Sequence, residues 1–197
     1  VRCKEAFWNR QGTKAAYSCW RQRQDERDRE DVLVYDVLTQ TSMPITNLGS
    51  IQYYSRILSW APDGQRLAYV REEEVEPVEP EDEFAEEIER LYVNDADGGN
   101  EQNLPFNGRI SQSPRWSPVE DVIALAGDRG KQDRTENIYL VRPEGGEAVN
   151  LTNNPEGAWL SDINWSADGT KMTYVGRPDR ENPYGLYVLD KATGVNT

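Results

Sequence analysis

The chain has 197 residues, of which 37% are hydrophobic and 29% are charged, a balance that suits one globular domain or a stack of small units. Its 22 basic and 35 acidic residues give a net charge of −13, which disfavours a nucleic-acid backbone as partner. No stretch approaches the roughly 18 apolar residues of a membrane-spanning helix. Histidine is absent, so a Ser-His-Asp triad and a histidine metal site are excluded, and two cysteines are too few for a closed zinc site.

The first 49 residues predict a unit of four short antiparallel strands. A hairpin is expected first, followed by a charged connection over Arg21–Asp31 and two further strands. Its strands are predicted over Lys4–Trp8, Lys14–Trp20, Val32–Val37 and Pro44–Asn47. Four antiparallel strands are the composition of one blade of a β-propeller.

The two cysteines, Cys3 and Cys19, lie on the two strands of this first hairpin. Folding the hairpin about its turn brings them opposite each other or one residue out of register. A disulfide is therefore geometrically possible and would indicate an oxidising compartment. Two buried free thiols are the alternative.

Three further units are predicted over 50–108, 109–157 and 158–197, which makes the chain a single domain of four units. In the second unit we expect strands over Tyr54–Trp60, Arg66–Arg71, Leu91–Asn94 and Gln102–Pro105. In the third they are expected over Ser111–Trp116, Val122–Gly127, Asn137–Val141 and Glu147–Thr152. The fourth has only three, over Leu160–Trp165, Lys171–Gly176 and Gly185–Asp190, so the total is fifteen.

One short phrase marks the first hairpin of every unit. It is clearest at Trp60-Ala61-Pro62-Asp63-Gly64 and recurs at Trp165-Ser166-Ala167-Asp168-Gly169, with weaker copies at Trp116 and Trp8. Proline and Asp-Gly are typical of the turn, and the tryptophan ends the strand before it. The tryptophans recur at intervals of 52, 56 and 49 residues, and a period near fifty indicates propeller blades. We expect Trp60, Trp116 and Trp165 to occupy equivalent, largely buried positions.

The second unit contains an acidic insertion over residues 72–89, with eleven carboxylates and no basic residue. Pro77 and Pro80 prevent a regular helix in its first half, whereas 84–88 allows a helical turn. A solvated loop and a docking element for a basic partner surface both fit this composition. The residues of a partner site here are Glu72, Glu73, Glu74, Glu81, Asp82, Phe84 and Ile88.

Taken together, these phrases resemble the TolB-type β-propeller repeat, which is WD-like. The matching segments are Trp60–Tyr69, Leu91–Gly99, Ile138–Asn154, Asn164–Tyr174 and Leu186–Gly194. The resemblance implies an all-β propeller of four four-stranded blades. Because fifteen strands fall one short of four complete blades, we expect an open ring or a part of a longer propeller.

Proteins with this repeat include periplasmic proteins that bind partners without catalysis, and the propellers that precede the hydrolase domain of prolyl-oligopeptidase-like enzymes. The resemblance therefore implies a non-enzymatic interaction or scaffold subunit, periplasmic or otherwise extracytoplasmic, held by other proteins at a membrane periphery. A gating propeller of a hydrolase and a carbohydrate- or peptide-binding module are the alternatives. We expect no catalytic residue, no cofactor, no metal, no nucleic-acid partner and no transmembrane segment.

Overall fold

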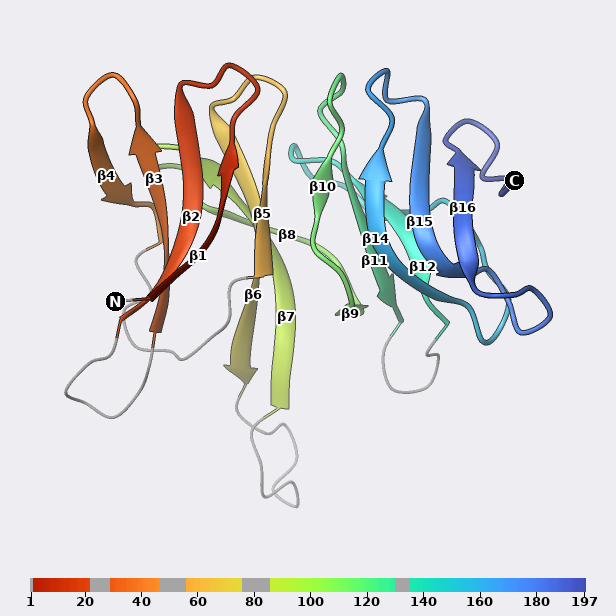
Figure 1. Ribbon diagram of the computed structural model, residues 1–197. Helices are drawn as coiled ribbons and strands as arrows, with labels where there is room; N and C mark the ends of the chain where they lie inside the picture. Colours follow the sequence, from red (N-terminus) through yellow and green to blue (C-terminus); the bar gives the residue numbers. More distant parts are fainter. Residues whose placement is uncertain (1, 22–28, 47–55, 76–85, 130–134) are drawn as a thin grey trace.

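The computed structural model describes residues 2–21, 29–46, 56–75, 86–129 and 135–197 (Figure 1). All regular structure in these residues is β-strand, which confirms the all-β fold class. Sixteen described strands form four antiparallel sheets, which stand side by side in chain order as an arc that does not close into a ring. The described residues contain no helix that is long and apolar enough to cross a membrane.

Each sheet is a local meander of consecutive strands. The first contains β1 (Arg2–Trp8), β2 (Lys14–Arg21), β3 (Arg29–Asp36) and β4 (Thr41–Pro44). The second contains β5 (Arg56–Trp60), β6 (Arg66–Val75), β7 (Glu86–Asp95) and β8 (Gln102–Leu104). The third contains β9 (Arg109–Ile110), β10 (Arg115–Trp116), β11 (Ile123–Asp128), β12 (Asn137–Val141) and β13 (Val149–Asn150). The fourth contains β14 (Trp159–Trp165), β15 (Lys171–Arg177) and β16 (Gly185–Asp190).

The first strand of every sheet is irregular. In three sheets its register with the second strand shifts, between Cys3 and Ala6, between Arg56 and Ser59, and between Ser161 and Asn164. In the third sheet the single strand expected over Ser111–Trp116 is instead two short strands, β9 and β10, which both pair with β11. Pro114, just before β10, has no N–H to donate to a ladder. Such bulges bend a strand and re-aim its side chains.

The turns of the first hairpins follow the repeated phrase. Gly12, Gly64 and Gly169 all adopt positive φ, between 67° and 69°, where a side chain would be strained. Each of these glycines donates its N–H to the carbonyl three residues earlier, at 2.9–3.0 Å. The aspartate before two of them accepts a further backbone hydrogen bond, as Asp63 does from the N–H of Gln65 at 2.8 Å. These bonds explain why Asp-Gly recurs in the phrase.

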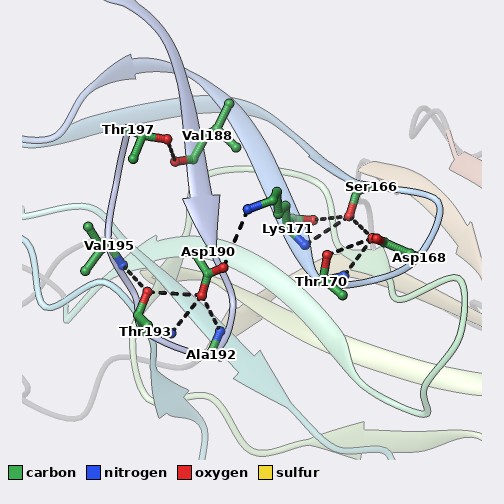
Figure 2. Close-up of polar contacts among 10 residues, drawn as sticks. All are labelled: Ser166, Asp168, Thr170, Lys171, Val188, Asp190, Ala192, Thr193, Val195 and Thr197. Atoms are coloured by element: carbon green, nitrogen blue, oxygen red, sulfur yellow. Dashed lines mark hydrogen bonds and ion pairs between the residues drawn. The ribbon is translucent and has the colours of Figure 1, made fainter.

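The fourth sheet shows this turn chemistry most fully (Figure 2). The Asp168 carboxylate accepts hydrogen bonds from the Ser166 hydroxyl at 2.6 Å and from the Thr170 N–H at 3.0 Å. These bonds stabilise the charged form and lower the pKa of Asp168 to about 2. At the next turn, Asp190 accepts N–H bonds from Ala192 and Thr193. Beyond that turn the backbone at 195–197 pairs with β16, where the sequence places the start of a fourth strand.

Three apolar clusters lie between the four sheets. The first joins sheets one and two and includes Val34 and Tyr69. The second joins sheets two and three and includes Leu91 and Leu125, and the third joins sheets three and four. The free energy gained by burying apolar groups is proportional to the area removed from water. The sheets are therefore held face to face mainly by these clusters.

The acidic segment differs from the expectation. A helical turn over 84–88 is wrong for Glu86–Ile88, which the structure places in strand β7, paired with the end of β6. Glu73 accepts ion-pair contacts from Arg71 and Arg90, each at 3.0 Å, and the Tyr92 hydroxyl also donates to it. Cross-strand pairs of this kind stabilise a sheet, so the hairpin extends beyond the apolar core.

A covalent link closes the first hairpin. Cys3 and Cys19 lie directly opposite each other in the β1–β2 register, and the structure joins them by a disulfide. The sequence allowed the two cysteines to be opposite each other or one residue out of register, and the structure has them opposite each other. A bond that closes a short loop restricts the unfolded chain, so it stabilises this edge of the arc.

Candidate functional site

The four first-hairpin turns lie together at one end of the sheets, at the top of the view in Figure 1. Hydrogen bonds link them across large sequence distances. The Arg10 guanidinium donates to the Pro118 carbonyl at 3.0 Å, which joins the first turn to the third. Gln11 donates to the Asp63 carbonyl at 3.2 Å, which joins the first turn to the second. The turns therefore form one continuous surface.

Close packing between the turns gives the repeated glycines a second role. An added Cβ on Gly64 would meet the Gln11 Oε1 at 2.0 Å, and one on Gly169 would meet the Val119 Cγ2 at 2.4 Å. In each case the neighbour comes from the preceding unit. The positive φ therefore favours glycine at both positions, and at Gly169 the turn of the preceding unit also leaves little room for a side chain.

The tryptophans of the repeated phrase connect neighbouring sheets through their ring N–H groups. The Trp60 Nε1 donates to the Phe7 carbonyl at 2.8 Å, and the Trp165 Nε1 donates to the Arg115 carbonyl at 2.8 Å. In both cases the acceptor is the residue just before the preceding unit's tryptophan. Sheets two and three are joined by a different hydrogen bond, in which the Ser59 hydroxyl accepts the Trp116 backbone N–H at 2.7 Å.

The burial of these rings is only partly as expected. Trp116 is 5% exposed, which agrees with the prediction, but Trp60 and Trp165 are half-buried. Trp8 in the first unit is 59% exposed. Three of these four rings, those of Trp8, Trp60 and Trp116, face a pocket, so they are not pure core residues.

The pocket has a volume of about 560 Å³ and is formed by residues from all four units. Most of its lining is apolar, with aromatic rings and prolines contributed by the turns. Its polar lining residues are Arg10, Ser59, Arg115 and Asn164. Small-ligand and peptide sites are typically concave and apolar with a few placed polar groups, and this pocket has that composition.

Two arginines, Arg10 and Arg115, line the pocket of this acidic protein. Among the described residues both Arg10 and Arg115 have only backbone carbonyls as hydrogen-bond partners: Pro118 for Arg10, and Pro114 and Ile163 for Arg115. Burial lowers the pKa of the Arg115 guanidinium, and the nearby charge of Asp162 offsets this only in part. The pocket thus contains a partly desolvated cation without an ion-pair partner in the described part of the chain.

Among the described residues, none that lines this pocket is acidic. Ser59 is the one hydroxyl-bearing residue among the described residues of the lining, and its hydroxyl accepts the backbone bond from Trp116. Elsewhere, no group of three or more potential ligands that could hold a metal ion occurs among the described residues. The geometry of the pocket is suited to binding.

The partner-site residues predicted in the acidic insertion are at the other end of the second sheet. Glu72 and Glu73 lie on β6 and Ile88 lies on β7, opposite Glu73. Glu74 belongs to β6, whereas Glu81, Asp82 and Phe84 fall outside the described residues. The predicted partner site therefore stays a prediction, and it shares no residue with the pocket.

Sequence reasoning missed the pocket residues Phe7, Arg10 and Arg115. A signal was present in the residue before each tryptophan, where Phe7, Ser59, Arg115 and Asn164 differ although the phrase around them repeats. All four of these residues line the pocket. In this chain, the position that varies within the repeated phrase therefore lies at the pocket.

Comparison with known proteins gives structural neighbours only. No family model and no curated protein matches the chain. TolB from Acinetobacter baumannii superposes with a TM-score of 0.69 at 19% identity, over 100% of this chain and 43% of that one. Putative TolB from Agrobacterium tumefaciens gives 0.67 at 20% identity, over 99% and 64%. Pyrococcus horikoshii acylaminoacyl peptidase gives 0.63 at 16% identity, over 99% and 31%.

The fold is a TolB-like β-propeller. At these identities the likeness establishes the fold alone, and the chain spans less than two thirds of each of these three neighbours. The open arc agrees with an open or partial propeller. In these terms the four sheets are blades, and the pocket lies at the end of the propeller where the first-hairpin turns of the blades meet.

Proposed function

We propose that this chain is a non-enzymatic interaction module and that its turn-lined pocket receives a segment of a partner protein. One observation carries the proposal: the pocket is formed jointly by all four blades, with an apolar aromatic wall and two cations. Surfaces that bind partners tightly are enriched in Trp, Tyr and Arg, clustered in a pocket that excludes water.

The lining of the pocket favours a protein segment over a neutral sugar. The Trp60 and Trp116 ring N–H groups already donate to the Phe7 carbonyl and to the Asp121 carboxylate, at 2.8 and 3.1 Å. These two ring N–H groups are therefore satisfied within the protein. Apolar side chains of a peptide need no such donors, because their binding comes from the area that they bury.

The disulfide between Cys3 and Cys19 supports an extracytoplasmic location. Disulfides persist in oxidising compartments and are rare where glutathione keeps thiols reduced. We therefore place the module outside the cytoplasm, at the periphery of a larger assembly. This placement rests on the disulfide and is tested by its redox state in protein taken from its native compartment.

The experiment is site-specific photo-crosslinking in the source organism. A photoreactive phenylalanine analogue at position 8 replaces the exposed pocket ring, and the same analogue at position 159 is the control. Trp159 is 41% exposed but lies in the fourth blade, outside the pocket. The proposal expects one discrete protein adduct from position 8 and not from position 159. Identical adducts from both positions, or none from position 8, would contradict it.

A second function, the gating propeller of a peptidase, is supported by the structural likeness to an acylaminoacyl peptidase. In that case a catalytic domain would be encoded in the same reading frame. The complete gene discriminates between the two proposals. A hydrolase domain that follows in frame supports gating, and a partner crosslinked at position 8 in a chain without such a domain supports the interaction module.

A further inference from the structure

We infer that the pocket is selective for a carboxylate-bearing peptide segment, with apolar side chains next to the acidic group. This inference rests on the proposed function and adds the chemistry of the partner. It comes from comparing the two pocket cations with the other cations of the chain. Most described basic side chains already have a carboxylate partner, and the two that line the pocket do not.

The pairing of the other cations is extensive. Arg66 contacts Asp63 and Asp121 at 2.8 and 3.0 Å, and Arg109 contacts Asp128 at 2.9 Å. Lys14 and Lys191 make similar ion pairs at 2.5 Å. With 35 acidic against 22 basic residues, carboxylates are abundant in this chain. Unpaired cations are the minority among the described side chains; Arg177, which donates to the Gly157 carbonyl outside the pocket, lies over the Tyr184 ring instead.

Arg115 is the more constrained of the two cations. Its Nε donates to the Ile163 carbonyl at 3.0 Å and its Nη1 to the Pro114 carbonyl at 3.3 Å. These bonds use only part of the five-donor fork of a guanidinium, which is suited to bidentate binding of a carboxylate. A partly buried cation gains most from an anionic ligand, because its charge has already lost part of its water.

The acidic segment of the second sheet lies away from the end of the sheets that holds the pocket, so it does not repel an acidic ligand there. The described part of the acidic segment contains Glu72–Glu74 on β6 and Glu86, Glu87 and Glu89 on β7. Strand β6 runs from Arg66, beside the turns, to Val75, and it ends at the opposite end of the sheet (Figure 1). From Arg66 to Glu72, the first carboxylate of the segment, six residue steps at about 3.3 Å give about 20 Å, beyond the screening length of about 8 Å at physiological ionic strength.

The chemistry of the ligand is one carboxylate, which can belong to an acidic side chain or to a chain terminus. The three probes are acetylated tetrapeptides that share Leu-Phe-Ala. One ends in a glutamate amide, one ends in a glutamine amide, and one ends in alanine with a free carboxylate. Binding of each peptide to the disulfide-intact protein is measured by isothermal titration calorimetry at low and at physiological salt.

We expect at least one acidic peptide to bind at least tenfold more tightly than the glutamine peptide, with a preference that shrinks as salt is raised. The Glu peptide and the free-carboxylate peptide distinguish the two sources of the charge. Equal affinity of the neutral and both acidic peptides would overturn the inference. So would tighter binding of a galacturonic acid trisaccharide than of every peptide, or no peptide binding at 5 mM.

Variants assign the selectivity to the pocket. Arg10→Gln removes the more exposed cation and should reduce the preference for the acidic peptides at least threefold. Arg115→Lys keeps the positive charge but loses the bidentate guanidinium. The same binding preference is measured for this variant as a second test. Arg142→Gln is the matched control, because Arg142 is exposed, contacts Glu144 and lies outside the pocket. An unchanged preference in both pocket variants would overturn the inference, whereas the photo-crosslinking result tests the proposed function separately.

Discussion

Replacement of Trp165 by phenylalanine tests whether the repeated tryptophan holds neighbouring blades together. The change removes the ring N–H that donates to the Arg115 carbonyl at 2.8 Å and keeps an aromatic ring in place. A lost hydrogen bond costs about 1 kcal/mol, and an unsatisfied carbonyl in a partly buried place adds about as much. The expected loss is therefore about 2 kcal/mol. In a chain of this size it lowers the melting temperature by about 4–8 °C.

The measurement is urea unfolding followed by circular dichroism, together with thermal melts. Trp159→Phe is the control, because it removes a tryptophan N–H that has no acceptor among the described residues and keeps the ring that contacts Tyr184. It should change the free energy of unfolding by less than about 0.5 kcal/mol. If Trp165→Phe and Trp159→Phe unfold at the same urea concentration, the ring N–H does not hold the blades together and the reasoning is refuted.

Three further predictions concern other parts of the propeller. Reduction of the Cys3–Cys19 disulfide, which spans 16 residues, should cost about 3 kcal/mol, seen as a lower melting temperature with reductant; an unchanged melting temperature would argue against the bond. Tyr174→Phe should be neutral or stabilising by about 1 kcal/mol in urea unfolding, because the buried hydroxyl has no hydrogen-bond partner in the described part of the chain; a clear loss of stability would reveal a partner. The folded pKa of Asp168, about 2, is below its ordinary value of 3.8, so its contribution is complete above pH 3.8 and is lost as the pH falls towards 2. Asp168→Asn should therefore lower the urea midpoint at pH 7 and have little effect at pH 2; equal effects at both values would exclude this linkage.

The repeated hairpins could be predicted because their cause is local. Pro62, Asp63 and Gly64 specify a turn by their own backbone preferences, and the same chemistry recurs at Asp168 and Gly169. The extension of β6 and β7 could not be predicted in this way. Its residues have no alternating apolar pattern, and Glu73 is held by Arg71 on its own strand and by Arg90 on the neighbouring strand.

The pocket depends on contacts that no local pattern encodes. Arg10 reaches Pro118 across 108 residues of sequence, and Arg115 and Trp60 line the same pocket only because two blades stack. The sequence instead predicts a partner site in the acidic insertion, because this segment stands out in composition. Composition marks where charge is dense, whereas a binding site needs groups that the fold brings together from several units.

The central claim, that the pocket between the turns is the binding site, is tested most directly by fluorine NMR. Protein labelled with 5-fluorotryptophan has six resonances, one for each tryptophan, which phenylalanine substitutions assign. On titration with the acidic peptide that binds more tightly, the resonances of Trp8, Trp60 and Trp116 should shift together and saturate with one dissociation constant. The resonance of Trp159, outside the pocket, should stay in place. A shift of Trp159 while the three pocket resonances stay fixed would contradict the account.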